Sequence, residues 1–201
     1  NLVVVGHDDR TANFENMNTF FTTDGGGTWT AAPLGDAGDG IVSNFRFDPA
    51  VIFDPSGNAY AAYGARNGTP AGTTVVVARS TDGGATWGTF RQLATDVNIT
   101  GGPPGNDRWT FASGPGPGGT GQRVYLAWTQ NVVESGSTDQ RIVVSSSSDA
   151  GVTWSAPVIV NDASIAGTDA NNLTALPAVG PDGDLYLASP DITGNQMTLQ
   201  F

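Results

Sequence analysis

The sequence predicts an all-β protein, a β-propeller of four-stranded antiparallel blades, and three observations support this prediction. An eight-residue motif, S/T-x-D-x-G-x-T-W, occurs at Thr22–Trp29, Ser80–Trp87 and Ser147–Trp154. Each copy follows an apolar run of strand length that is rich in β-branched and aromatic residues. Gly, Pro, Asn and Ser interrupt every window in which a helical periodicity could develop. Because a tight internal repeat determines the architecture, we expect one supersecondary unit to recur along the chain.

Within each copy of the motif, the Asp and Gly residues predict a tight turn. Gly adopts positive φ without a steric penalty, and the Asp carboxylate can accept backbone N–H bonds inside the turn. The Trp follows at a fixed offset, where its ring can cover the base of the hairpin. We therefore expect a structural role for the Asp and Trp residues of all three copies, which are Asp24, Trp29, Asp82, Trp87, Asp149 and Trp154.

A second repeated signal lies between the hairpins. Residues 51–63 and 177–188 both have the pattern strand, turn, strand, and Tyr60, Tyr125 and Tyr186 occupy one repeat position, with Val3 in the same phase. Together with the hairpins this gives four antiparallel strands per unit, which is one propeller blade. We expect a single propeller segment of about two whole and two partial blades, part of a longer chain or assembly, with units near 1–47, 48–106, 107–173 and 174–201.

The motif resembles the Asp-box, or BNR repeat, of sialidase-like β-propellers of the bacterial secreted type. In that family the Asp-boxes are remote from the active site, and the enzyme uses an arginine triad, a Tyr nucleophile with a Glu partner, and an Asp acid/base. This chain has Phe45-Arg46-Phe47-Asp48-Pro49 in place of the family's Arg-Ile-Pro motif. Its only Glu residues are Glu15 and Glu134. The resemblance therefore implies the fold without the enzymatic motif, and we assign no catalytic residue.

The charge and composition of the chain exclude some partners. The net charge is −11, and all eight basic residues are Arg. Nucleic acids and anionic membrane surfaces require a basic patch, so we expect neither as a partner. No apolar run approaches the roughly 20 residues of a membrane span. The low charged fraction, the abundance of Thr, Gly, Asn and Ser and the absence of Lys are typical of an extracellular or cell-surface bacterial protein.

Propeller geometry places the three hairpins on one rim, so we expect a ligand site on the opposite rim. The loops there are long, and long loops on a rigid scaffold commonly carry binding sites. Their arginines could grip a carboxylate in bidentate fashion, and the alternative is ion pairing with neighbouring acids, since Asp107 precedes Arg108. The candidate ligand-binding residues are Arg10, Arg46, Asp48, Arg66, Asp107 and Arg108.

We expect no required cofactor, although acids in turns could ligate calcium. One His and no Cys make a transition-metal site a poor hypothesis. Carboxylates in turns are the hard oxygen ligands that calcium prefers, and the alternative is solvated turn acids without metal. The candidate calcium ligands are Asp8, Asp9, Asp36, Asp39, Asp182 and Asp184.

Three functions fit these observations. The leading hypothesis is a non-catalytic extracellular propeller that acts as a binding or structural module, with a glycan or protein ligand on the rim opposite the Asp-boxes. The alternative is an exo-α-sialidase or related glycoside hydrolase. A second alternative is a self-assembling subunit joined through incomplete end blades, with further blades or other copies of the chain pairing at the termini.

Overall fold

The computed structural model describes residues 1–7, 17–34, 39–41, 45–67, 72–95, 105–134, 137–160, 174–193 and 196–200. Within these ranges the regular structure is β-strand, with one 3-10 turn at Pro117–Gly119 and no α-helix. The same residues contain no helix that is long and apolar enough to cross a membrane. The expectation of an all-β chain is confirmed.

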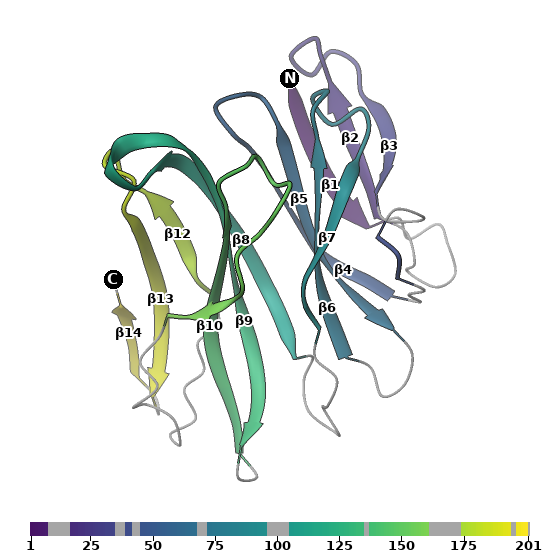
Figure 1. Ribbon diagram of the computed structural model, residues 1–201. Helices are drawn as coiled ribbons and strands as arrows, with labels where there is room; N and C mark the ends of the chain where they lie inside the picture. Colours follow the sequence, from purple (N-terminus) through teal and green to yellow (C-terminus); the bar gives the residue numbers. More distant parts are fainter. Residues whose placement is uncertain are drawn as a thin grey trace.

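The strands form four antiparallel sheets that follow one another along the chain (Figure 1). In each sheet the strands are neighbours in chain order. The second sheet begins at Phe45, so Arg46 and Phe47 belong to it and not to the preceding unit. The first sheet contains β1 (Leu2–His7), β2 (Met17–Thr22) and β3 (Thr30–Leu34); the second contains β4 (Phe45–Phe53), β5 (Ala59–Asn67), β6 (Gly72–Ser80) and β7 (Gly88–Thr95); the third contains β8 (Asn106–Gly116), β9 (Thr120–Glu134), β10 (Ser137–Ser147) and β11 (Val158–Ile159); the fourth contains β12 (Leu176–Val179), β13 (Leu185–Thr193) and β14 (Gln196–Gln200).

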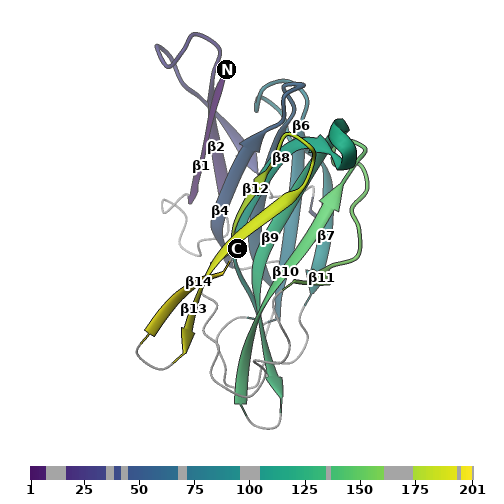
Figure 2. The same ribbon diagram turned by 90° about the vertical axis from the view of Figure 1, so that its left-hand side faces the viewer.

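Three apolar layers hold consecutive sheets together. Met17 and Tyr63 lie in the layer between the first and second sheets, and Val77 and Trp128 lie in the layer between the second and third. A third cluster around Tyr125 joins the third sheet to the fourth. The sheets therefore stack side by side, and Figure 2 shows this arrangement after a quarter turn.

The strand register confirms the repeat position assigned to Tyr60 and Tyr125. Tyr60 lies opposite Arg79 and Tyr125 lies opposite Ser146, each one residue before a hairpin motif. Val3 lies opposite Phe21, which is the same position in the first sheet, so Val3 is in phase with the tyrosines. Tyr60 and Tyr125 are buried, as packing predicts, whereas Tyr186 is 59% exposed.

The three motif hairpins, at residues 22–29, 80–87 and 147–154, share one hydrogen-bond pattern. In the second, the Asp82 carboxylate accepts bonds from the backbone N–H and the hydroxyl of Thr86, at 2.9 and 2.5 Å. Ser80 donates its hydroxyl to the same carboxylate at 2.7 Å. Asp24 and Asp149 accept the corresponding bonds in the other two hairpins. The turn thus occupies these carboxylates, and Figure 1 shows the hairpins at the same upper end of the sheets, which we call the hairpin rim.

Each of the later hairpins rests on the sheet before it. A Cβ atom at Gly84 would lie 2.4 Å from the Val3 side chain, and one at Gly151 would lie 2.6 Å from the Tyr60 ring. Both glycines also have positive φ, 94° and 80°. Glycine is required there because the turn and the close approach leave no room for a side chain.

The motif tryptophans differ in their surroundings. Trp87 is partly buried and donates its Nε1–H to Thr19 of the first sheet at 2.8 Å. Trp154 packs against the cluster that contains Val77, and its Nε1 has no partner, because Val77 occupies the position that Thr19 has one sheet earlier. Trp29 is 44% exposed, so the expectation of an aromatic plug fails for the first hairpin.

The hairpin carboxylates make the stability of the fold sensitive to acid. Hydrogen bonds from Thr153 lower the pKa of Asp149 to about 2, and hydrogen bonds led by those from Thr22 and Thr86 also lower the pKa values of Asp24 and Asp82. A carboxyl whose pKa is lower in the folded than in the unfolded protein stabilises the fold at pH values above the unfolded pKa of about 3.9. This stabilisation is lost as the pH falls from there to the folded-state pKa.

We therefore expect the thermal midpoint to fall between pH 5 and pH 2. Circular dichroism melts of the wild type and of a variant with Asn at all three Asp positions test this. The variant should show a smaller fall over that pH range, and parallel curves for the two proteins would contradict the prediction.

Candidate functional site

The rim opposite the hairpins carries the beginnings of β4 and β8, the first strands of the two four-stranded sheets. Strands alternate in direction, so the first strand of each sheet begins at the end remote from the hairpin (Figure 1). Five of the candidate ligand-binding residues lie on or beside these strand beginnings, namely Arg46, Asp48, Arg66, Asp107 and Arg108.

Both strands are interrupted by a β-bulge at the same place. The pairing of β4 with β5 shifts between Phe47 and Ala50, and the pairing of β8 with β9 shifts between Asp107 and Thr110. The first bulged residues are Asp48, with φ 49°, and Arg108, with φ 57°. Neither residue is glycine, so each backbone pays a conformational cost of about 1–3 kcal/mol. Such strained positions concentrate at binding and catalytic sites, where bulges redirect side chains.

Aromatic rings form the base beneath the two bulges. The Phe47 and Trp109 ring centroids lie 5.5 Å apart, and those of Phe45 and Phe47 lie 5.4 Å apart. Trp109 donates its Nε1–H to the backbone carbonyl of Asp48, which ties the second bulge to the first. Gly64 makes this packing possible, because a Cβ there would lie 2.4 Å from the Trp109 ring and 2.7 Å from the Phe47 ring.

Asp48, Asp107 and Arg108 form a charged group at the surface above this base. Burial raises the pKa of the Asp107 carboxyl, and a hydrogen bond with the Asp48 carboxyl and the charge of Asp48 raise it further. Arg108 acts in the opposite sense through its Nε, 3.8 Å from Asp107 Oδ2. The side chains of Arg108 and Asp107 are 48% and 25% exposed, so both can reach a ligand.

Arg66 approaches the site from β5. Its guanidinium lies over the rings of Phe45 and Phe47, at 5.3 and 5.2 Å from their centroids. Its Nε has no hydrogen-bond partner. Arg66 is thus a cation that packs on an aromatic surface, and its Nε–H is a hydrogen-bond donor without an acceptor.

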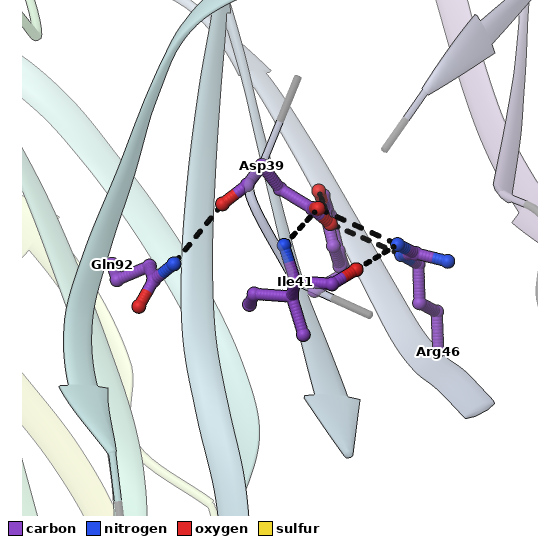
Figure 3. A network of polar contacts seen from close by, with 5 residues as sticks. Asp39, Ile41, Arg46 and Gln92 are labelled. Carbon is purple, nitrogen blue, oxygen red and sulfur yellow. Dashed lines mark hydrogen bonds and ion pairs between the residues drawn. The ribbon is translucent and has the colours of Figure 1, made fainter. Parts of the chain in front are cut away.

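Arg46 points to the opposite face of the second sheet and is part of a buried network (Figure 3). Its Nε lies 3.1 Å from Asp39 Oδ2 and its Nη2 donates to the Ile41 carbonyl at 3.2 Å. Tyr63 donates its hydroxyl to Asp39, and Gln92 donates to the Asp39 carbonyl. Arg46 and Asp39 are 3% and 5% exposed. The structure therefore places Arg46 in the core, with its ion pair to Asp39, and away from the aromatic base of the bulges.

Three of the candidate calcium ligands, Asp39, Asp182 and Asp184, lie within the described residues. Asp39 accepts bonds from Arg46, Tyr63 and the Ile41 N–H, so its oxygens have protein donors. Asp182 and Asp184 lie in an exposed turn before β13. Across the part of the chain that the structure describes, no three acids or histidines are grouped closely enough to hold a metal. Calcium binding stays a prediction. Three candidate calcium ligands and one candidate ligand-binding residue lie outside the described residues: Asp8, Asp9, Asp36 and Arg10.

Sequence reasoning missed the residues that support the site. It did not find the two bulges, because Asp48-Pro49 and Arg108-Trp109 share no residue type that marks their equivalence. It also missed Phe45, Trp109 and Gly64 as one packing unit. A glycine inside a predicted strand is a signal of close backbone approach or of a bulge, and Gly64 in β5 was such a signal.

Comparisons with known proteins support the propeller fold. Neither protein-family models nor curated protein sequences give a match. Among solved structures, the chain is similar to a GH93 α-L-arabinofuranosidase of Fusarium graminearum in complex with arabinobiose, with a TM-score of 0.61 and 16% identity over 92% of this chain and 52% of that one. It is also similar to an α-L-arabinanase of Penicillium chrysogenum complexed with arabinobiose, with a TM-score of 0.56 and 13% identity over 98% of this chain and 58% of that one.

Both of these neighbours are β-propellers, so a propeller-type fold is supported for this chain. The chain spans just over half the length of each of them. The number of blades in a closed ring and the specific resemblance to sialidases stay predictions.

Gly64 gives a direct test of how the site is supported. Gly64→Ala should destabilise the chain by about 1–3 kcal/mol, because the added methyl group collides with Trp109 and Phe47. Chemical denaturation followed by fluorescence measures this. Gly88→Ala is the matched control, since a Cβ at Gly88 meets nothing within 4 Å. Equal midpoints for the two variants would show that the aromatic base tolerates displacement.

Proposed function

We propose that the chain is part of a non-catalytic, carbohydrate-binding β-propeller whose glycan lies across the bulges of β4 and β8. The observation that carries this proposal is the pair of strained, non-glycine bulges. They hold Asp48 and Arg108 at the same place on β4 and β8, the first strands of two neighbouring sheets. Backbone strain of this kind persists where surrounding packing maintains it, and it is typical of ligand-binding positions.

The chemistry of the bulge site suits a polyhydroxylated ligand. Sugar hydroxyls both donate and accept hydrogen bonds, and the site offers carboxylate acceptors at Asp48 and Asp107 beside guanidinium donors at Arg66 and Arg108. Phe45 is partly buried and supplies an apolar surface next to them. A few convergent polar groups over an aromatic base are the usual composition of a small-molecule site. The arabinobiose bound by both structural neighbours makes a pentose oligosaccharide the first glycan to test.

The sequence departs from the sialidase pattern in a way that favours binding over catalysis. The chain has Phe45-Arg46-Phe47-Asp48-Pro49 in place of the Arg-Ile-Pro motif of that family. Arg46 is buried and paired with Asp39, so it does not lie with the other arginines of the bulge site.

A glycoside hydrolase is the second candidate, and one observation favours it. Burial and Asp48 raise the pKa of Asp107, which is the direction that a general acid requires. An exo-α-sialidase is the form of this candidate that the hairpin repeat suggests, and an arabinose-releasing enzyme is the form that the structural neighbours suggest.

Membership of the Asp-box family and an extracellular or cell-surface location belong to the same proposal. The hydrogen-bonded hairpin that occurs three times supports the family, and the Lys-free composition with its low charged fraction supports the location. A protein ligand in place of a glycan would be expected to use the same bulge site.

Isothermal titration calorimetry with arabinobiose and longer arabino-oligosaccharides tests the proposal. We expect binding by the wild type and at least a tenfold weaker affinity for Asp48→Asn and Asp107→Asn. Asp182→Asn, an exposed acid in a turn at the hairpin rim, is the matched control and should bind like the wild type. Equal affinity for all four proteins, or no affinity for any glycan in the panel, would overturn it.

Activity assays separate the two candidates. We expect no sugar release from fluorogenic α-L-arabinofuranoside or sialoside substrates. Turnover that Asp107→Asn abolishes would replace the binding proposal with the hydrolase.

A further inference from the structure

Arg66 differs from the other arginines of the second and third sheets in having no acceptor for its guanidinium. Arg46 and Arg108 lie beside aspartates. Three more donate to uncharged oxygens, namely Arg79, Arg91 and Arg123. No hydrogen bond or ion pair joins Arg66 to any residue in the part of the chain that the structure describes. The net charge of the chain is −11, so an isolated cation next to the bulge site is unexpected.

Thr73 adds a second polar group without a partner, directly beside Arg66. The register pairs Arg66 of β5 with Thr73 of β6 and with Phe45 of β4. Side chains that lie directly opposite each other in an antiparallel pair share one face of the sheet and are in contact distance. Thr73 is 0% exposed, and its Oγ1 has no hydrogen-bond partner. Asn106 of β8 donates to the Thr73 backbone carbonyl and not to this hydroxyl.

The two unsatisfied groups point to a ligand oxygen. A buried polar group without a partner destabilises the fold, so native proteins retain few of them, and those that remain call for an explanation. An oxygen acceptor can receive a hydrogen bond from the Nε–H of Arg66 and another from the Thr73 hydroxyl. A carboxylate also balances the charge of Arg66, which a neutral hydroxyl does not, and its planar shape matches the guanidinium fork.

We propose that the glycan of the bulge site carries a carboxylate, as a uronic acid does, and that Arg66 and Thr73 bind this carboxylate beside the Phe45 ring. The inference rests on the proposed function and adds the charge of the ligand to it. The ring hydroxyls of the same sugar then face Asp48 and Asp107. Arg108, whose Nε lies 3.8 Å from Asp107 Oδ2, offsets part of the negative charge there.

Calorimetric titration with digalacturonate and with the galactobiose of the same linkage tests the charge of the ligand. These disaccharides differ only in the oxidation of the hydroxymethyl group to a carboxylate. We expect the wild type to bind digalacturonate about tenfold or more tightly than galactobiose, because charge-assisted hydrogen bonds are roughly twice as strong as neutral ones. A wild type that binds both disaccharides with equal affinity would overturn the carboxylate subsite and leave glycan binding standing.

Three variants test the two residues. Arg66→Gln should lose the preference for digalacturonate, and Arg66→Lys should retain part of it, because Lys keeps the charge but lacks the planar fork. Thr73→Val keeps the shape of the side chain and removes only the hydroxyl, so it should weaken digalacturonate binding more than galactobiose binding. Because the Thr73 hydroxyl has no protein partner, circular dichroism melts of this variant should match the wild type.

Arg91→Gln is the matched control, since Arg91 is an exposed arginine of β7 whose Nε donates to the Val152 carbonyl in the third hairpin. It should bind both disaccharides like the wild type. An unchanged preference in Arg66→Gln would overturn the subsite alone. The absence of binding to digalacturonate, galactobiose and arabinobiose would overturn the subsite together with the proposed function.

Discussion

Replacing Asp39 with Ala should lower the free energy of unfolding by about 3–5 kcal/mol, because it removes one partner of a buried ion pair. Arg46 is 3% exposed, and both carboxylate oxygens of Asp39 accept hydrogen bonds from it. The Tyr63 hydroxyl would lose its acceptor as well. Burial and the charge of Asp39 raise the pKa of Tyr63, so Tyr63 is a neutral donor at neutral pH.

Urea denaturation measures this loss, and Arg108→Ala is the matched control. Arg108 also pairs with an Asp, but it is 48% exposed, so removing that pair should change stability by less than about 1 kcal/mol. A similar small effect for Asp39→Ala would mean that water reaches Arg46. A large effect would establish that residues 39–41 are fixed to β4, β5 and β7 by this network.

Replacing Trp87 with Ala should also cost about 3–5 kcal/mol. The ring packs on the apolar layer between the first and second sheets, beside Met17 and Leu34. Its Nε1–H donates to Thr19, which in turn donates to the Ala32 carbonyl, so one side chain joins a hairpin to the sheet before it. The cost combines lost apolar contact with the loss of the hydrogen bond to Thr19.

Trp87→Phe separates these two contributions. It retains much of the ring and removes only the hydrogen bond, which should cost about 1 kcal/mol beyond the change in ring size. Trp29→Ala is the matched control in the first hairpin, where the ring is exposed, and a much smaller loss of stability is expected. Equal losses for Trp29→Ala and Trp87→Ala would show that the tryptophan serves its own hairpin and not the neighbouring sheet.

The fold could be predicted from the sequence because its signals are local. The Asp82 carboxylate, the Ser80 hydroxyl and the Thr86 N–H lie within one turn, so residue types at fixed offsets determine the hairpin. The position of the tyrosines relative to the hairpin follows from strand pairing, and the register agrees with it. Because the motif occurs three times at similar spacing, the strands around one copy predict the strands around the others, and so the succession of sheets.

The candidate site was harder to predict from the sequence than the fold, because its contacts join distant parts of the chain. Arg46 and Phe47 are adjacent in the sequence, yet their side chains lie on opposite faces of the second sheet. Only Phe47 packs with Trp109 under the bulges, whereas Arg46 pairs with Asp39. Asp39 precedes the strand that it stabilises, and its donors Arg46 and Tyr63 lie farther along the chain. The contact of Asp48 with Asp107 depends on two bulges whose residues differ in chemistry. Nothing in the local sequence predicts that pairing.

The central claim is that the bulge site, and not the hairpin rim, binds a glycan. The most direct measurement is an NMR titration of the ¹⁵N-labelled chain with arabinobiose. We predict that the largest amide shift changes occur at residues 45–48, at Arg66 and at residues 105–109, with little change in the three hairpins. Shift changes confined to the hairpins at 22–29, 80–87 and 147–154, or none at saturating sugar, would contradict the account.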